Sequence, residues 1–266
     1  MEEKINYKKQ FGQNFIYDTN LLKAIVSDAE VDNKDEVLEI GVGVGSLTKQ
    51  ICLKASKVVS YEIDTSLEPY IKDNLNDISN HTLIFKDIME EDNENIKKHF
   101  KGDFKIVANL PYYITTPIIF KFLEGNFNLI SLTIMVQKEV GERIVSKENS
   151  KDYGILSVML QSYANCKVTR NINRKMFTPS PNVDSCLVKI DIDNNKFNIQ
   201  NKEKYRDFIK NCFSMRRKTL ANNLKGKVDK DLLINALNTL NLKENVRTEQ
   251  ISVENLVNLF NLLYKN

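Results

Sequence analysis

The sequence predicts an α/β protein with a doubly wound parallel sheet, followed by a small all-helical C-terminal domain. From residue 36 onward, short and almost wholly apolar segments alternate with longer amphipathic ones, as in βαβ units whose strands are buried on both faces. After about residue 195 the β-branched runs end, and apolar residues recur at helical spacing. We therefore expect one domain over residues 1–195 and a helical domain over residues 196–266.

Each expected strand of the first domain is a short apolar run bounded by polar or turn residues. These runs cover residues 36–43, 57–64, 81–87, 104–111, the beginning of 130–145, and 185–193. The intervening segments place apolar residues three and four apart, which predicts helices. These helices cover residues 46–55, 66–77, 116–125 and the end of 130–145. A charged segment between the third and fourth strands has room for one more.

Three segments of the C-terminal domain show helical spacing of apolar residues: 204–224, 230–242 and 252–265. Ser252 begins the third of them, where a serine is a plausible N-cap. The polar residues 193–203 form the expected linker. Residues 201–230 carry ten Lys/Arg against three Asp/Glu, in a chain whose net charge is +3. Such a cluster is typical either of a nucleic-acid-binding surface or of a solvated helix face.

The composition argues against several classes of protein. No window approaches the roughly 20 apolar residues that a membrane helix needs, and the first residues lack the apolar core of a secretory signal. We therefore expect a cytoplasmic protein. Four scattered cysteines without C-x-x-C spacing indicate reduced thiols rather than disulfides or zinc. The chain has two histidines, so we expect neither a histidine-based metal site nor a Ser-His-Asp triad.

A glycine-rich turn, "EIGVGVGSLT", joins the first expected strand to its helix. Gly41, Gly43 and Gly45 allow the backbone to approach a ligand closely, whereas a dinucleotide site needs its third glycine where Ser46 stands. The G-x-G-x-G spacing is similar to the methionine-cofactor loop of S-adenosylmethionine methyltransferases. A purely structural tight turn is the alternative interpretation of this turn alone.

Carboxylates follow the next two expected strands. Glu62 ends the second strand, where an acidic side chain can accept hydrogen bonds from a ribose diol. Asp87 follows the third strand and can accept a hydrogen bond from an adenine amine. Either residue alone could be a solvated charge at the end of a strand. Together with the glycine turn, at the edge where open α/β sheets bind ligands, they indicate a cofactor with an adenosine end.

The fourth expected strand ends in "NLPY", an uncharged corner suited to methylating an exocyclic amine. The Asn109 side-chain oxygen and the Leu110 carbonyl can accept hydrogen bonds from an adenine NH₂, which frees the nitrogen lone pair. Pro111 stiffens the turn and offers no competing donor. Tyr112 presents a flat face on which a flipped base can stack. The alternative is a turn whose tyrosine only packs.

These segments together closely resemble the rRNA adenine dimethyltransferases of the KsgA and Erm type. The resemblance spans most of residues 8 to 224 and rests on the motifs "KKQFGQNF", "EIGVGVGSLT", "NLPYYITTPI", "QKEVGERI", "YGILSVMLQ", "FTPSPNVDS" and "FSMRRKTLANNL". It implies a Rossmann-like methyltransferase sheet and transfer of two methyl groups from S-adenosylmethionine to the N6 of an rRNA adenosine. Val42, where many members have proline, and Tyr113, where some have asparagine, depart from the pattern without removing a stacking face or a backbone approach.

The resemblance also implies roles for individual residues. Cofactor contacts are expected from Gln13, Asn14, Phe15, Gly41, Gly43, Glu62, Ile63, Asp87, Ile88 and Asn109. The target adenosine is expected to meet Asn109, Leu110, Pro111 and Tyr112, with Phe177 as a second aromatic wall. Contacts to rRNA phosphates are expected from Lys8, Lys9, Arg216, Arg217 and Lys218. No metal is required.

Leu110 and "FTPSPNVDS" are similar to the branch that dimethylates two adjacent adenosines near the 3′ end of 16S rRNA in the assembling small subunit. The resistance-conferring branch, which methylates 23S rRNA, usually has isoleucine in its N-I-P-Y motif. A non-catalytic RNA-binding assembly factor is a second alternative, although the glycine turn and the "NLPY" corner are both intact. A DNA adenine methyltransferase fits less well, because its corner has two prolines. We expect a monomer.

Overall fold

The computed structural model describes Lys8 and residues 11–264, which form two compact units. The first holds the described residues through Gly141 together with Lys167–Ile192, and the second holds Glu142–Cys166 and the described residues from Asp193 onward. The second unit therefore includes residues 142–166, which the sequence assigned to the first domain. A buried hydrogen bond of 2.9 Å from the Tyr153 hydroxyl to the Ile251 carbonyl ties these residues to the C-terminal helices.

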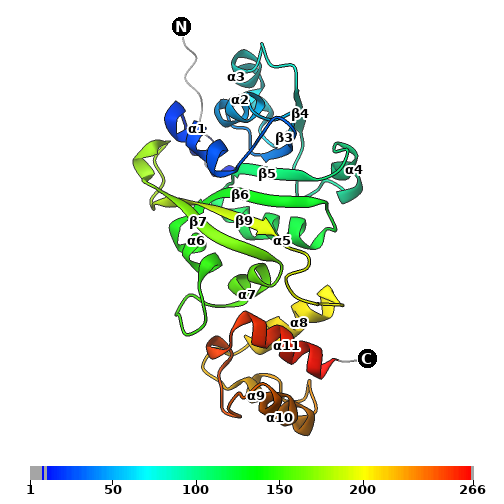
Figure 1. Ribbon diagram of the computed structural model, residues 1–266. Coiled ribbons are helices and arrows are strands. Elements are labelled where there is room, and N and C mark those ends of the chain that lie inside the picture. The colour runs from blue at the N-terminus through cyan, green and yellow to red at the C-terminus, as the bar shows by residue number, and fades with distance from the viewer. Residues whose placement is uncertain (1–7, 9–10, 265–266) are drawn as a thin grey trace. The chain divides into compact units, whose positions relative to one another are not determined.

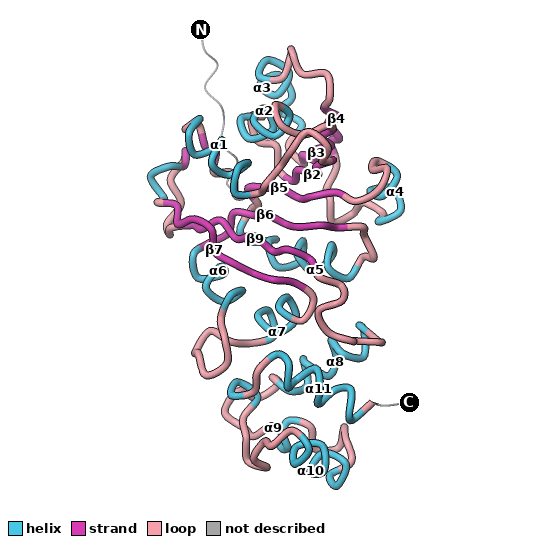
Figure 2. The backbone as a smooth tube through the Cα atoms, in the orientation of Figure 1, coloured by secondary structure: helices cyan, strands magenta, loops and turns pink. Residues whose placement is uncertain are grey.

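A seven-stranded sheet, drawn in magenta in Figure 2, has the order β4-β3-β2-β5-β6-β9-β7. Its first five strands are parallel, and β9 runs antiparallel to β6. The strands are β1 (Phe15–Ile16), β2 (Glu36–Ile40), β3 (Lys57–Glu62), β4 (His81–Phe85), β5 (Phe104–Asn109), β6 (Leu129–Gln137), β7 (Ala164–Ile172), β8 (Phe177–Thr178) and β9 (Ser185–Ile192). The short strands β1 and β8 pair with each other apart from the main sheet.

The expected helices are present in the expected order, and α1 and α7, which the sequence did not predict, are added to them (Figure 1). They are α1 (Thr19–Asp28), α2 (Ser46–Cys52), α3 (Glu68–Asn74), α4 (Asn93–Lys98), α5 (Thr115–Glu124), α6 (Lys138–Val145), α7 (Ile155–Gln161), α8 (Lys202–Cys212), α9 (Leu220–Asn223), α10 (Lys230–Thr239) and α11 (Val253–Leu263). The charged segment before β5 holds α4. Residues 204–224, expected to be one helix, instead form most of α8 and the separate short helix α9.

Alternation along β5 explains how helices cover both faces of the sheet, since successive side chains point to opposite faces. Val107 joins a buried cluster with residues of α1 and α2, such as Ile25 and Ile51. Phe104, three positions earlier and so on the other face, lies edge-on to Phe127, which in turn packs on Phe122 of α5. The mostly apolar character of β5 is thus a consequence of burial on two sides.

The second unit has a core built from aromatic side chains of α8 and α11. The rings of Tyr205 and Phe260 lie 5.2 Å apart in an edge-on arrangement, and Phe208 packs beside both. The Ser252 side chain accepts a hydrogen bond from the backbone of Asn255, which confirms Ser252 as the N-cap of α11. Amphipathic spacing was enough to predict these helices, because each buries one face against its neighbours.

The described residues, Lys8 and 11–264, contain neither a membrane-spanning helix nor a cluster of metal-ligating side chains. None of their helices is both long and apolar enough to cross a membrane. Nor do three or more of their His, Cys, Asp or Glu side chains come together in a group that could hold a metal ion.

Candidate active site

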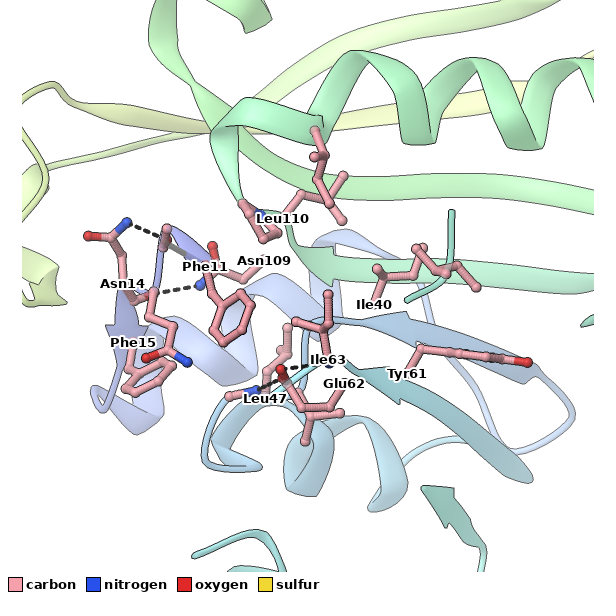
Figure 3. Close-up of a pocket in the computed structure, with 18 of the residues that line it drawn as sticks. Phe11, Asn14, Phe15, Ile40, Leu47, Tyr61, Glu62, Ile63, Asn109 and Leu110 are labelled. Atoms are coloured by element: carbon pink, nitrogen blue, oxygen red, sulfur yellow. Dashed lines mark hydrogen bonds between the residues drawn. The ribbon is translucent and has the colours of Figure 1, made fainter. Parts of the chain in front are cut away.

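A pocket opens in the first unit at the carboxyl ends of β2, β3, β4 and β5. It encloses about 1120 Å³, counting the space that is open to solvent. All ten residues expected to contact the cofactor line it: Gln13, Asn14, Phe15, Gly41, Gly43, Glu62, Ile63, Asp87, Ile88 and Asn109. Figure 3 labels some of them, such as Asn14, Glu62 and Asn109, which come from segments far apart in the sequence. The parallel sheet brings them together because all its carboxyl ends share one edge.

The glycine loop, residues 41–45, forms one wall of the pocket between β2 and α2. Gly41, Gly43 and Gly45 have φ angles of +80°, +60° and +85°, a region that side chains rarely adopt. A Cβ on Gly43 would also come within 3.0 Å of the Phe15 ring. The loop therefore needs glycine both for its backbone path and for space, and it presents bare backbone to the pocket.

Glu62, at the end of β3, is almost fully buried and bonded to backbone on both carboxylate oxygens (Figure 3). Its Oε2 accepts the Gly43 N–H at 2.9 Å, and its Oε1 accepts the Ile63 and Asp64 N–H groups, also at 2.9 Å. Burial raises the pKa of Glu62, although these N–H groups partly oppose the rise. A carboxylate offers about four acceptor positions, so about one strong acceptor position remains, on Oε2.

Asp87 lies just beyond β4, on the side of the pocket formed by Ile88. Its Oδ1 accepts the Met89 backbone N–H at 2.8 Å, which fixes the direction of the carboxylate. Ile88 is buried and closes the floor beneath it. This arrangement leaves acceptor capacity on Oδ2, as an adenine amine would require.

Asn109 has the amide orientation that accepting an amine requires. Its Nδ2 donates a hydrogen bond of 2.9 Å to the backbone carbonyl of Asn14 (Figure 3). Because a carbonyl can only accept, the NH₂ end must face Asn14, and the Oδ1 end faces the other way. Among the residues that the structure describes, the hydrogen bond of this side chain is made by Nδ2, and none is made to Oδ1. The sequence predicted that Asn109 is an acceptor, but it did not predict that the Asn14 carbonyl orients its amide.

The rest of the "NLPY" corner lines the pocket beside Asn109. Leu110 is buried, and the Pro111 carbonyl accepts the Ile114 N–H at 3.2 Å as the chain enters α5. The Tyr112 hydroxyl lies 2.6 Å from the Ser185 hydroxyl, so the ring is held at its far end. Tyr113 also lines the pocket but is 59% exposed. The two adjacent tyrosines therefore have different surroundings.

Phe177 does not lie where the resemblance implied. Its side chain is 3% exposed and packs in the buried cluster of α1 and α2, next to Ile16, whose strand it pairs with. It is not among the residues that line the pocket. The burial of Phe177 contradicts a role as an open stacking wall, because its neighbours in the core already cover the ring.

The five residues expected to bind RNA have three different placements. The Lys8 ammonium lies 2.6 Å from Asp64 Oδ1 in the first unit, and Lys9 lies outside the described residues. In the second unit Arg216 donates to the Lys151 carbonyl, while Arg217 and Lys218 are exposed in the turn before α9. The ion pair with Asp64 removes Lys8 from the set of free cations.

The pocket also contains residues that the sequence did not single out. Phe11, Gly12 and Tyr61 line it, and the side chain of Tyr61 is buried. Phe11 belongs to the motif "KKQFGQNF", so its position two residues before Gln13 was the available signal. Tyr61 stands in an apolar strand and has no such signal.

Two comparisons with known proteins agree on one family. A family model described as "Ribosomal RNA adenine dimethylase" matches residues 4–265. The "Ribosomal RNA small subunit methyltransferase A" of Clostridium botulinum (strain Kyoto / Type A2) is 39% identical over 263 residues, covering 98% of this chain and 95% of that protein.

Two solved structures superpose over nearly the whole chain. A dimethyladenosine transferase from Plasmodium falciparum has a TM-score of 0.80 at 24% identity, covering 92% of this chain and 95% of that one. The 23S rRNA methyltransferase ErmE has a TM-score of 0.74 at 24% identity, covering 94% of this chain and 99% of that one. These likenesses confirm the predicted fold class.

Proposed function

The chain belongs to the ribosomal RNA adenine dimethylase family, and on that premise we propose that it dimethylates the N6 of two adjacent adenosines near the 3′ end of 16S rRNA. Membership confirms the predicted resemblance and the predicted class, an rRNA adenine dimethyltransferase that uses S-adenosylmethionine. The orientation of the Asn109 amide is the observation that supports methyl transfer to an amine at this site. A free acceptor beside a cofactor pocket is what an amine-methylating corner needs.

The pocket fits S-adenosylmethionine. Gly41, with a φ angle of +80°, brings bare backbone to the pocket beside the target corner, since a Cβ there would lie 3.5 Å from the Asn109 carbonyl oxygen, an ordinary contact. We assign the ribose to the remaining acceptor position of Glu62 and the adenine amine to Asp87. When bound, the cofactor supplies an electrophilic methyl group on its sulfonium.

The protein's own contribution is placement of the target amine. Asn109 Oδ1 and the Leu110 carbonyl each accept one hydrogen of the adenine NH₂, which draws the nitrogen lone pair out of conjugation. Tyr112 stacks on the base, a contact worth roughly 1–3 kcal/mol. The N–CH₃ bond forms as the S–CH₃ bond breaks, and the methylated nitrogen becomes acidic and releases its proton to solvent. Since neither acceptor needs to change protonation, catalysis here depends on positioning rather than on a strong base.

Sequence similarity favours small-subunit rRNA over 23S rRNA as the substrate. The relative that is 39% identical over 98% of this chain has the small subunit in its name. The fold does not discriminate, because the dimethyladenosine transferase and ErmE both superpose over more than nine-tenths of the chain. Leu110, in place of the isoleucine usual in the resistance branch, supports the same choice.

We assign rRNA phosphate contacts to the second unit, through Arg217 and Lys218, with Arg216 beside them. Phosphate contacts position an RNA without reading its sequence. We further propose that the protein works in the cytoplasm as a monomer on the assembling small subunit. Sedimentation of the purified protein, alone and with small subunits, tests whether it is a monomer and whether it binds the small subunit.

The decisive experiment is methyl transfer to two substrates, by the purified protein and by its Asn109→Ala variant. Small subunits that lack the modification should become dimethylated on two adjacent adenosines, mapped by mass. Naked 23S rRNA should remain unmodified, and the Asn109→Ala variant should leave both substrates unmodified. Methylation of 23S rRNA in preference to small subunits would assign the chain to the resistance branch. S-adenosylmethionine binding without methylation of either substrate would favour a non-catalytic assembly factor.

A further inference from the structure

Two side chains of the N-terminal strap, defined as Lys8 and residues 11–14, converge on the carboxylate of Asp64. The Lys8 ammonium lies 2.6 Å from Asp64 Oδ1, and Gln13 Nε2 donates to Asp64 Oδ2 at 2.7 Å. The Gln13 side-chain oxygen in turn accepts the Lys8 backbone N–H at 2.8 Å. The three residues thus form a closed set of hydrogen bonds, which we call the Lys8–Gln13–Asp64 latch.

Asp64 is a fixed anchor for this latch. Its side chain is 2% exposed, and its Oδ1 also accepts the Ser66 hydroxyl at 2.6 Å. Burial alone would raise the pKa of Asp64, but hydrogen bonds from Lys8, Ser66 and Gln13 outweigh it and hold the pKa below its usual value. A buried, ionised carboxylate with several donors has little freedom to move, so it can hold the strap in one place.

The same anchor touches the cofactor side of the pocket. The Asp64 backbone N–H donates to Glu62 Oε1 at 2.9 Å, only two residues from the carboxylate assigned to the ribose. On its other side the strap meets the catalytic corner, because the Asn14 carbonyl accepts the Asn109 amide at 2.9 Å. The strap therefore spans the pocket from the ribose end to the amine-binding end.

We propose that Asp64 and Lys8 are positioning residues, whose latch holds the N-terminal strap closed over the bound cofactor and presents the Asn14 carbonyl to Asn109. This proposal rests on the proposed function in so far as the pocket binds S-adenosylmethionine. In this proposal Lys8 pairs with Asp64 instead of binding an RNA phosphate. Gln13 holds the strap in place in addition to contacting the cofactor.

The test measures the dissociation rate of S-adenosylhomocysteine from full-length variants by stopped flow, with the binding constant from calorimetry. Lys8→Met and Asp64→Asn should each raise the dissociation rate at least about tenfold and leave the association rate within about twofold. A strap that opens more often lets ligand leave sooner, whereas it opposes entry little. The effect of the double variant should fall well short of the product of the two single effects, since the Lys8–Asp64 ion pair is lost in all three variants. Lys8→Arg should restore slow dissociation.

The control is Lys34→Met, which removes an exposed lysine of the same unit and should leave dissociation unchanged. Melting temperatures, measured in parallel, separate a latch from a merely stabilising ion pair. If Lys8→Met lowers the melting temperature while the dissociation rate stays at the wild-type value, the proposed role of the latch is refuted. Additive effects of Lys8→Met and Asp64→Asn would overturn it as well. Failure of the wild-type protein to bind S-adenosylhomocysteine would instead refute the proposed function.

Discussion

The hydroxyl of Tyr112 lies 2.6 Å from the hydroxyl of Ser185, which is fully buried at the start of β9. These residues belong to two motifs that the sequence treated separately, "NLPY" and "FTPSPNVDS". Burial raises the pKa of Tyr112, and the Ser185 hydrogen bond partly opposes the rise, so the phenol stays neutral. The contact fixes the direction of the ring whose face is assigned to the target base.

Replacing Ser185 with alanine should therefore weaken the use of RNA without affecting the cofactor. One hydrogen bond is worth about 1 kcal/mol, so kcat/KM for small subunits should fall about fivefold. Tyr112→Phe removes the same hydrogen bond from the other side, and the double variant should be no worse than either single one. If the two losses multiply, the hydroxyls act independently and the positioning role of Ser185 is wrong.

Asn109→Ala should abolish methyl transfer while largely sparing cofactor affinity. Loss of the amine acceptor should reduce the single-turnover rate at least about a hundredfold, as loss of a positioned polar group at a reacting centre does elsewhere. The affinity for S-adenosylhomocysteine should fall less than about tenfold, because a single hydrogen bond to the strap is lost. Asn171→Ala, an exposed amide on β7, serves as the control. An affinity loss as large as the rate loss would contradict the assigned role.

Glu39 should make the stability of the protein depend on pH. This side chain is fully buried on β2, and burial raises its pKa from 4.5 to about 8, partly opposed by the Ser60 hydroxyl. Between those two values the folded state holds a proton that the unfolded state releases, so stability falls as pH rises.

The comparison of wild type with Glu39→Gln isolates this effect from other titrating groups. Relative to the variant, the wild type should lose about 1 kcal/mol or more of unfolding free energy between pH 5 and pH 8. Urea unfolding at several pH values measures the difference, and Glu36→Gln at the start of the same strand is the control. Parallel stability curves for wild type and Glu39→Gln would refute a perturbed Glu39.

Arg217 and Lys218 should contribute salt-sensitive affinity for RNA. Replacing both with alanine should weaken binding to small subunits and reduce the slope of log K against log salt by about two. Arg216 is left in place because it donates to the Lys151 carbonyl. The matched control is Lys230→Ala with Lys243→Ala, which removes the same charge from exposed sites of the same unit. An equal loss in the control would indicate general electrostatic attraction rather than a defined contact.

Apolar periodicity predicted most elements of the fold, because strands buried on both faces and amphipathic helices leave clear patterns. The strand β7 was missed because its polar residues hide that pattern in "ANCKVTRNI". The assignment of residues 142–166 to the second unit was missed for a different reason. It depends on contacts such as Tyr153 with Ile251, which are remote in sequence.

The sequence by itself predicted the chemistry, since the identities of Gly41, Glu62, Asp87 and Asn109 indicate which groups are expected to face a cofactor and an amine. Parallel strands of one sheet then bring these residues to a common edge whatever the details of packing. Tertiary structure alone decided which of the predicted groups remain available to bind a ligand. It buried Phe177 in the core, paired Lys8 with Asp64 and turned the Asn109 amide with the Asn14 carbonyl. These hydrogen bonds and this burial depend on segments that are far apart in the sequence and meet only in the folded protein. A local sequence pattern therefore does not predict them.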